Sequence, residues 1–465
     1  MGVAVEVLHE GQRFACELRD VSQSGFACEW PSDAAPEVGT VLEEAVLRFD
    51  DHEAYRGRVK VSSVRRDEKV TLIGASLIDT LMNIEDVLHL RDVKTSIAGA
   101  EFDDLAFRGA PWRVSGQERF KALVADLRLF LEDAEEKFRG LEASLPWHVT
   151  RGEQTSPARD MLIERIRGGF TREVVTASNE IDAALRSASR SEREALREYS
   201  VRHLHALLMQ SWWMHRALLK PLGYPGDYEV MNAVYGDLFQ GPTLFAKAIN
   251  MALAWTPAAV AVRTRRDLLK AELSALLDRG GADQPLRVLS IAAGPAQEIF
   301  ELLDERRELP RALEIVLFDQ DKGALSYSYG RLSRLISSRF AGGVRLVHLH
   351  DSIKRLLRGS TVLGTSGRFD AIYACGLFDY LQPSTWVSLA RNLYEAAAPG
   401  GTVYIGNMVP TNPSRWFMEL HLDWFLEYRE RAELLALARR AAPEANVRIL
   451  EESTGVNPFV AMTRD

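Results

Sequence analysis

The sequence predicts a multidomain α/β protein: a small β-barrel, then a helical middle region, then a parallel sheet that ends in an antiparallel hairpin. Three observations predict this organisation. The spacing of apolar residues changes from every second residue to every third or fourth, and then to alternating strand-like and helix-like runs. The segment "RGGADQP" separates the last two regions. The length of 465 residues suits two to four domains, and we expect them at 1–95, 96–280 and 281–465.

The first region consists of short runs in which apolar and polar residues alternate. Such runs, with turn residues between them, are typical of strands. The runs are "VAVEVLHEG", "RFACELRDV", "GFACEW", "VLEEAVLRF", "RGRVKVSSV" and "VTLIGASLI". Short strands at this spacing predict a small barrel, with Cys16 and Cys28 as core thiols.

The middle region repeats apolar residues every three or four positions, as amphipathic helices do. Ser191, with Glu194 three residues later, predicts a helix N-terminus. The pattern is interrupted at "KPLGYPGDY", residues 220–228, and then resumes to about residue 280. A break of this kind within helical sequence often marks a functional loop.

The last region alternates strands and helices from residue 285 onward. Its strand-like runs are "LRVLSIA", "LEIVLFD", "VRLVHLHD", "FDAIYACG" and "GTVYIGNMV". This alternation predicts βαβ units on a parallel sheet. The end of the chain differs, because "NVRILEES", the turn "TGVNP" and "FVAMTRD" form a hairpin. The last strand should therefore run antiparallel to the others.

The composition excludes several classes of protein. The net charge of -8 argues against a general nucleic-acid-binding protein, which needs a basic face to displace counterions. No apolar run approaches the roughly 20 residues that span a bilayer, and the N-terminus lacks the pattern of a signal peptide. Cys16, Cys28 and Cys375 have no metal-ligand spacing. We expect a cytoplasmic protein without a metal, a nucleic-acid partner or membrane insertion; a homo-oligomer remains compatible with these features.

Polar residues end the first three strands of the last region, where ligands of open α/β sheets bind. The first strand stops at a turn of small residues that contains Gly294. The second ends at Asp319, 25 residues later, where a carboxylate can accept hydrogen bonds from both hydroxyls of a ribose. The third ends at Asp351, whose carboxylate can accept a hydrogen bond from an adenine amino group. These positions predict a nucleoside site.

Residues 285–465 resemble the class I S-adenosylmethionine-dependent methyltransferases. The family has its first glycine motif at "VLSIAAGPAQE", its ribose acid at "LFDQD", its adenine contact at "HDS" and its fourth motif at "FDAIYACGLFDYL". The resemblance implies a Rossmann-like methyltransferase sheet, small-molecule chemistry and S-adenosyl-L-methionine as the cofactor. It implies that the cofactor-binding residues are Ala292, Gly294, Pro295, Glu298, Asp319, Gln320, Asp351, Ser352, Cys375 and Gly376.

The first motif departs from the family pattern at three positions. Ser290 stands where an acid is usual, and Ala292 and Ala296 stand where glycine is usual. Because alanine tolerates fewer backbone angles than glycine, we expect this turn to keep ordinary conformations. A nicotinamide enzyme is a competing interpretation, but the GxGxxG pattern is absent and the final hairpin argues against it. A sheet that has lost its cofactor is a further alternative, against which Asp319 and Asp351 weigh.

Two segments bear on the methyl acceptor. "WWMHRALLKPLGYPGDYEVMNAVYG", residues 212–236, and "HLDWFLEYR", which begins at residue 421, look like the bacterial 3-hydroxypalmitic acid methyl ester biosynthesis group. The likeness implies methylation of the carboxylate of a small or fatty hydroxy acid. Such an acceptor is already ionised, whereas a hydroxyl or amine can require a general base. We expect Tyr224, Asp227, Tyr228 and His421 to be catalytic, and Asn232, Arg263, Tyr380 and Trp424 to bind the acceptor.

The barrel resembles PilZ domains, which bind cyclic di-GMP. Asp20, Ser22 and Gly25 match the D/N-x-S-x-x-G motif of that family. Binding members also carry an RxxxR motif upstream, whose arginines grip the phosphates, but here Arg13 and Arg19 have a different spacing. Either the barrel is degenerate and serves contacts, or the natural start lies further upstream. The chain is accordingly a methyltransferase with a possible cyclic di-GMP input, or a non-catalytic signalling adaptor with degenerate nucleotide-binding domains.

Overall fold

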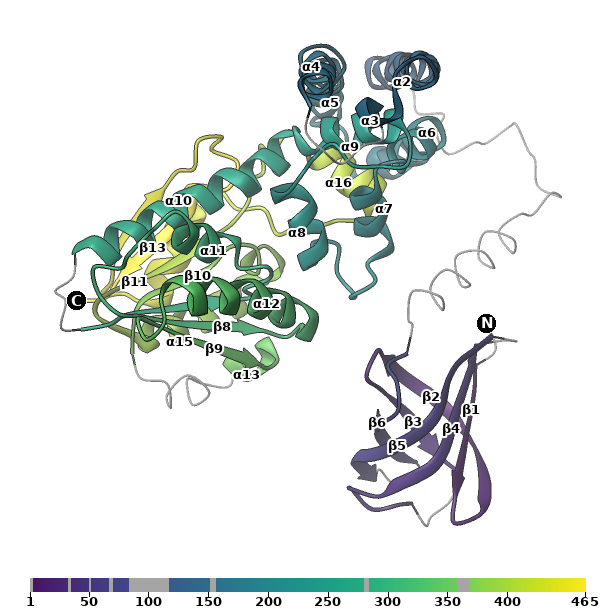
Figure 1. Cartoon of the computed structure of the whole chain (residues 1–465), viewed down its shortest axis with the longest axis vertical. Helices are drawn as coiled ribbons and strands as arrows, with labels where there is room; N and C mark the ends of the chain where they lie inside the picture. Colours follow the sequence, from purple (N-terminus) through teal and green to yellow (C-terminus); the bar gives the residue numbers. More distant parts are fainter. Residues whose placement is uncertain are drawn as a thin grey trace. The chain divides into compact units, whose positions relative to one another are not determined.

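The chain forms two compact units, Met1–Gly109 and Ala110–Asp465 (Figure 1). The first unit holds the barrel, and the second holds both the helical region and the sheet. The helices and the sheet therefore form one body, which the change in sequence pattern near residue 280 does not indicate. The computed structural model describes residues 3–31, 35–49, 52–66, 70–82, 117–150, 156–279, 284–357 and 368–465.

Six antiparallel strands close the barrel in the order β1-β2-β3-β6-β5-β4. Cys16 and Cys28 lie inside it, as expected. The strands are β1 (Val3–His9), β2 (Gln12–Ser22), β3 (Gly25–Trp30), β4 (Val41–Phe49), β5 (His52–Arg66) and β6 (Thr71–Leu77).

The D-x-S-x-x-G motif forms the tight turn between β2 and β3. Ser22 pairs with Gly25 across the turn, and its hydroxyl donates to the Gly25 carbonyl at 3.1 Å. Gly25 packs directly on β6, since a Cβ there would lie 2.5 Å from the Ala75 carbonyl oxygen. The two nearby arginines are paired as well: Arg13 bonds with Glu44 at 3.2 Å, and Arg19 Nε with Glu29 at 2.7 Å. The turn residues and these arginines thus have structural partners within the barrel.

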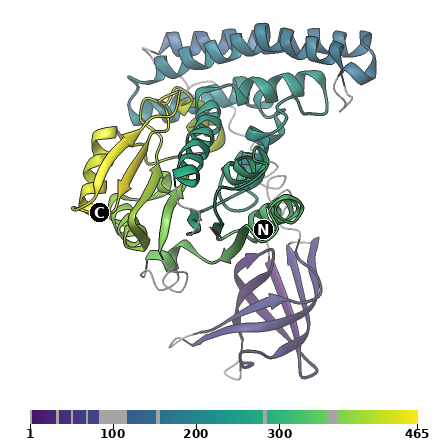
Figure 2. The same ribbon diagram turned by 60° about the vertical axis from the view of Figure 1, so that its left-hand side comes forward.

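The helical region is built around one apolar core. Its elements are α2 (Glu118–Ser144), α3 (Trp147–Thr150), α4 (Pro157–Ile166), the π-helix η2 (Arg167–Thr171), α5 (Arg172–Leu185), α6 (Arg190–Leu208), α7 (Trp212–Leu219), α8 (Tyr228–Tyr235), α9 (Leu244–Ala254) and α10 (Pro257–Arg279). The segment from α2 to α6 lies on the side that faces away from the sheet (Figure 2). Its apolar core also takes in α16 (Arg415–Leu422), a helix from the far end of the chain.

Helix α6 begins two residues earlier than expected. Ser189 is its N-cap, and the Ser189 and Glu192 side chains each accept from the other's backbone N–H in a capping box. Ser191 and Glu194 have the same spacing, so the motif alone does not choose between the two pairs. The predicted N-cap at Ser191 was therefore wrong: the helix uses the earlier serine, Ser189, which begins a motif of the same spacing.

No single helix in the described ranges is long and apolar enough to cross a membrane. Helices α9 and α10 meet that test together by length and composition, with a bend of 62° between them. All residues of α9 are buried within the helical region. The apolar composition of α9 is therefore explained by its place in the core of the helical region.

The sheet has seven strands in the order β12-β13-β11-β10-β7-β8-β9. Only β13 runs antiparallel to its neighbours, and it lies between β11 and β12. The expected hairpin is thus present, and the fold class predicted from the sequence is confirmed. The strands are β7 (Leu286–Ile291), β8 (Leu313–Asp319), β9 (Val344–His350), β10 (Phe369–Ala374), β11 (Ala397–Gly406), β12 (Asn446–Leu450) and β13 (Phe459–Thr463).

Helices cover both faces of the sheet. One face packs against α10 and two helices of the βαβ units, and the other packs against the remaining helices (Figure 1). The helices on the α10 face are α11 (Gln297–Asp304) and α12 (Lys322–Arg339). Those on the opposite face are α13 (Ile353–Leu357), α15 (Pro383–Ala396) and α17 (Arg431–Ala441). A short 3-10 helix, η3 (Phe378–Tyr380), follows β10.

Candidate active site

The strand order reverses between β7 and β10, and a cavity of about 430 Å³ opens at the carboxyl ends of these strands. This is the topological switch point at which open α/β sheets bind their ligands. The cavity has the volume of a small-molecule site. Sheet turns form one part of its lining, and the helical region with the segment around α16 forms the rest.

The turn after β7 adopts a conformation that the sequence did not predict. Ala292, Gly294 and Ala296 have φ values of 52°, 54° and 48°. The expectation of ordinary angles was wrong, because two alanines occupy the left-handed region, which costs an alanine about 1–2 kcal/mol. Two bonds to the end of β8 hold the turn in place: Ala293 N–H donates to the Phe318 carbonyl at 3.1 Å, and Gly294 N–H donates to Asp319 Oδ2 at 2.8 Å.

Asp319 ends β8 beside this turn and lines the cavity. Its Oδ1 accepts from the Asp321 N–H at 2.9 Å, and burial raises the pKa of its carboxyl. Each carboxylate oxygen can accept more than one hydrogen bond. Asp319 is therefore held rigidly by backbone donors and keeps acceptor capacity toward the cavity.

Most of the predicted cofactor-binding residues line this cavity together. They are Ala292, Gly294, Pro295, Glu298, Asp319, Gln320, Cys375 and Gly376. Asp351 and Ser352 do not line it. Asp351 instead pairs with Arg355 at 2.7 Å and accepts from the Ser352 N–H at 2.7 Å. The lining residue from this segment is Ile353.

Four of the predicted catalytic and acceptor-binding residues also line the cavity: Tyr224, Tyr228, Tyr380 and Trp424. Trp424 Nε1–H donates to the Tyr380 hydroxyl at 2.8 Å. Gly226 packs against the indole, since a Cβ there would lie 2.8 Å from it. The loop between α7 and α8 therefore meets the segment after α16 at the cavity wall.

The other predicted residues of this group do not reach the cavity lining. Asp227 caps α8 and bonds with Arg216 Nε at 2.9 Å, with only 1% of its surface exposed. His421 is equally buried, bonds through Nε2 to the Ser200 hydroxyl at 2.9 Å and stacks on His205. Burial lowers the pKa of His421 to about 3. The geometry gives both side chains structural roles.

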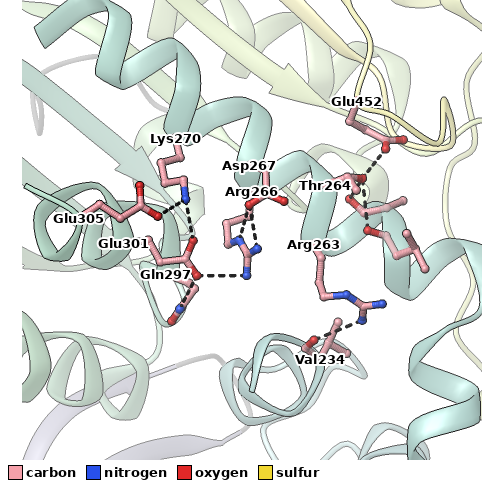
Figure 3. Close-up of polar contacts among 12 residues, drawn as sticks. Val234, Arg263, Thr264, Arg266, Asp267, Lys270, Gln297, Glu301, Glu305 and Glu452 are labelled. Atoms are coloured by element: carbon pink, nitrogen blue, oxygen red, sulfur yellow. Dashed lines mark hydrogen bonds and ion pairs between the residues drawn. The ribbon is translucent and has the colours of Figure 1, made fainter. Parts of the chain in front are cut away.

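Asn232 and Arg263 also lie outside the lining. Arg263 donates to the Val234 carbonyl at 3.4 Å (Figure 3). Its guanidinium also stacks over Trp255. Residues two apart on a helix point in different directions. As a result, Arg265 lines the cavity and Arg263 does not.

Arg265 is a cavity residue that the sequence analysis missed. Its side chain is buried, and its Nη1 donates to the Cys375 carbonyl and to Asn457 Oδ1, both at 3.0 Å. Its Nη2 lies against Gly376. The signal was available in the sequence, because Arg265 occupies one position of an apolar stripe at a spacing of four, with Ala261 and Leu269 as its neighbours.

Two buried carboxyls accompany Arg265 in the lining. Glu298 accepts from the Tyr373 hydroxyl at 2.6 Å, and burial raises the pKa of its carboxyl. Asp379 was not predicted. It lies on η3, accepts from the Met408 N–H at 2.7 Å, and has its pKa raised by burial to about 6. Buried, perturbed acids in a cavity are candidates for functional groups.

Ion pairs fasten α10 to α11, the helix that follows the left-handed turn (Figure 3). Arg266 bonds with Glu301 at 3.1 Å, and Lys270 bonds with both Glu301 and Glu305. Because α10 also carries Arg265, these pairs keep the arginine and the turn in register. The position of Arg265 in the cavity therefore depends on the ion pairs that Arg266 and Lys270 of α10 form with α11.

The second unit is thus an open α/β sheet with a cavity of small-molecule size at its switch point. No protein-family model matches the chain, and no curated protein does. Among solved structures, a possible exported protein from Bordetella parapertussis is 16% identical to the chain, with a TM-score of 0.39 over 67% of this chain and 99% of its own. Magnesium protoporphyrin IX methyltransferase from Synechocystis PCC 6803, with bound SAH, is 12% identical, with a TM-score of 0.35 over 50% and 92%. An N-methyltransferase from Bradyrhizobium japonicum, in complex with S-adenosyl-L-homocysteine, is 17% identical, with a TM-score of 0.29 over 44% and 87%.

Proposed function

We propose that the chain is an S-adenosylmethionine-dependent methyltransferase. One observation carries the proposal: Asp319 and the left-handed turn after β7 face one cavity at the switch point of the sheet. A carboxylate at the end of the second strand suits the two hydroxyls of a ribose. The donor set fits the rest of the cofactor as well, because Arg265 offers a buried cation to its carboxylate.

The chain's own residues would bind and enclose the reactants. When bound, the cofactor supplies a methyl group on a sulfonium. Asp319 holds the ribose, Arg265 holds the carboxylate, and Tyr224 and Trp424 shield the cavity from water. Alignment and exclusion of water are the main demands of an in-line displacement.

The acceptor we propose is a small or fatty hydroxy acid that is methylated on its carboxylate. The helical region and the segment around α16 contribute a largely apolar lining, which suits an apolar body. This lining includes Trp213, Leu222, Val230, Met231, Val234, Ala259, Val262, Phe417, Met418 and Leu426. A carboxylate is ionised at neutral pH, so this acceptor needs no general base.

The barrel is proposed to act as the regulatory unit. Cyclic di-GMP is the ligand implied by its PilZ-like motif, and a protein contact is the alternative. The protein contact is favoured because Arg13 and Arg19, the arginines nearest the motif, are already paired with glutamates. Calorimetric titration of the full chain with cyclic di-GMP separates the two, since only the first alternative gives heat of binding.

Titration of the full chain with S-adenosylhomocysteine tests the proposed function. We expect micromolar binding by the parent and a roughly 100-fold or greater loss in Asp319→Ala, because the two charge-assisted hydrogen bonds to the ribose contribute about 1.5–3 kcal/mol each. Asp267→Ala is the control, since Asp267 is exposed on α10.

Equal affinity in Asp319→Ala and the parent would remove the ribose assignment. A parent that does not bind S-adenosylhomocysteine would overturn the enzyme proposal and leave the non-catalytic signalling adaptor. A parent that binds it justifies an acceptor screen that begins with hydroxy fatty acids.

A further inference from the structure

Asp379 is a buried carboxylate that the fold leaves half satisfied. Only 2% of its surface is exposed, and it lines the cavity. Its Oδ1 accepts from the Met408 N–H, but no group in the described part of the chain donates to its Oδ2. A carboxylate removed from water with a single donor is costly, because each missing hydrogen bond leaves its desolvation uncompensated.

No cation in the described ranges forms an ion pair with Asp379. Arg265 directs Nη1 to the Cys375 carbonyl and to Asn457, and Arg429 directs its guanidinium to backbone and amide oxygens and to Glu433. Within the described residues, Asp379 therefore has no ion-pair partner, and Arg265 and Arg429 act on its charge only from a distance. This distinguishes it from Asp227, which is buried beside Arg216.

The backbone on both sides of Asp379 is held firmly in place. Arg429 donates to the Phe378 carbonyl at 3.1 Å and to the Leu381 carbonyl, which flank η3. The Asp379 carbonyl itself accepts from the Glu427 N–H at 2.6 Å. Arg429 is thus a positioning residue, and the carboxylate cannot easily leave the cavity wall.

The surroundings of Asp379 place it on the acceptor side of the cavity. Its hydrogen-bond partners, Met408 and Glu427, come from the segments around α16 and not from the turn after β7. Met408 also lines the cavity, as do Phe417 and Met418 nearby in sequence. A free carboxylate oxygen among apolar side chains can be satisfied only by water or by a donor on the ligand.

We infer that Asp379 selects the methyl acceptor by accepting a hydrogen bond from it, so that the acceptor is an apolar molecule with a hydroxyl or ammonium donor beside the methylated group. The inference rests on the proposed function and names the substrate class of the same cavity. An acceptor without the donor would displace water and leave the buried carboxylate unpaired. Sites built around such a hydrogen bond reject analogues that lack it by large factors.

Three probes with one chain length test this selection. Decanoate carries no donor at neutral pH, 3-hydroxydecanoate adds a hydroxyl, and 2-aminodecanoate adds an ammonium. Their affinities are measured by calorimetry on the full chain saturated with S-adenosylhomocysteine. We expect the parent to bind at least one donor-bearing probe 30-fold or more tightly than decanoate. This ratio corresponds to the free-energy cost of leaving a buried polar group without a hydrogen bond, about 2 kcal/mol.

Asp379→Asn is the matched variant. Its amide oxygen still accepts from the Met408 N–H, while its NH₂ group presents a donor where the parent presents an acceptor. We expect the preference to fall below about threefold, with unchanged affinity for S-adenosylhomocysteine. Asp267→Asn, on the exposed side of α10, should keep the parent's preference.

Several outcomes would overturn the inference. The parent could bind all three probes equally or bind none of them, a result that needs no variant. Asp379→Asn could keep the preference, or it could lose affinity for S-adenosylhomocysteine, which would assign the carboxylate to the cofactor's own ammonium. A parent that fails to bind S-adenosylhomocysteine would overturn the proposed function, whereas binding without a donor preference would overturn this inference alone.

Discussion

The carboxylates of the barrel and those of the cavity are treated in opposite ways. On the barrel surface, Asp79 is bonded to Arg58, and Glu44 and Glu53 are bonded to Arg56. These arginines lower the pKa of each carboxyl. Each of these acids is thus paired with an arginine of the barrel itself.

In the cavity, Glu298, Asp319 and Asp379 are buried, and burial raises the pKa of each carboxyl. None of the three forms an ion pair with an arginine or lysine of the described ranges. Charge that is buried without an ion-pair partner costs folding free energy, so its retention points to a ligand. The contrast separates acids that stabilise the fold from acids that are available for binding.

The two turns picked out from the sequence show the same contrast. The motif turn of the barrel closes its own hydrogen bonds and packs on β6, whereas the turn after β7 is held from behind by Asp319 and borders a cavity. A motif match therefore indicates binding only where polar groups remain open to a ligand. Three predictions test this difference.

The largest effect is expected from pH acting on Asp379. Its pKa is about 6 in the folded chain and about 4 when unfolded, so the folded state holds the proton more tightly. The free energy of unfolding should therefore fall as pH rises from about 4 to 6, by up to roughly 3 kcal/mol. Urea unfolding across this range should show a loss that is smaller in Asp379→Asn than in the parent by up to roughly 3 kcal/mol, because Glu298 and Asp319, whose pKa values burial also raises, contribute alike to both proteins.

The groups that act electrostatically on Asp379 are Arg265 of α10 and Arg429, and both remain charged over this range. They cannot produce the transition themselves. The same pH dependence in the parent and in Asp379→Asn would show that the burial of this carboxyl has no net cost. It would also weaken the distinction between cavity and barrel acids.

A smaller effect is expected from the glycine of the barrel motif. Gly25→Ala places a Cβ 2.5 Å from the Ala75 carbonyl oxygen, and relief of that overlap should destabilise the barrel by about 2 kcal/mol. Thermal melting of the full chain, with hydrogen exchange to assign the transition to the barrel, measures it. Ser24→Ala in the same turn is the control. If Gly25→Ala leaves the barrel as stable as Ser24→Ala does, the glycine is not there for packing.

The smallest effect is expected at the turn after β7. Ala292→Gly should raise the free energy of unfolding by about 1 kcal/mol, because φ is 52° and glycine is not strained there. Ala293→Gly is the matched control, since Ala293 keeps a negative φ and its replacement should destabilise by about 0.5–1 kcal/mol. Denaturant unfolding compares the two. Equal effects of the two substitutions would show that the left-handed conformation carries no strain.

The fold could be predicted from the sequence, because periodicity and turn residues report burial along a single element. The turn at Gly294 and the strand end at Asp319 could be predicted for the same reason. Arg265 carried a signal in its place on an apolar stripe, but neither its role nor that of Asp379 could be predicted, since their importance lies in which elements surround them. An arginine in an apolar stripe and an acid after a strand are ordinary locally. His421 and Asp227 lie outside the cavity lining for the converse reason: polar residues beside a break in a helix are often caps and core partners.

The insertion of α16 into the helical core limits how the chain can be divided. Its Trp416, Phe417 and Met418 pack among helices from more than two hundred residues earlier in the sequence. A fragment that starts at residue 281 would leave this helix without its neighbours and expose its apolar face to solvent. We therefore expect the sheet and the helices to fold as one unit. By contrast, the barrel has an apolar core of its own, built from its six strands.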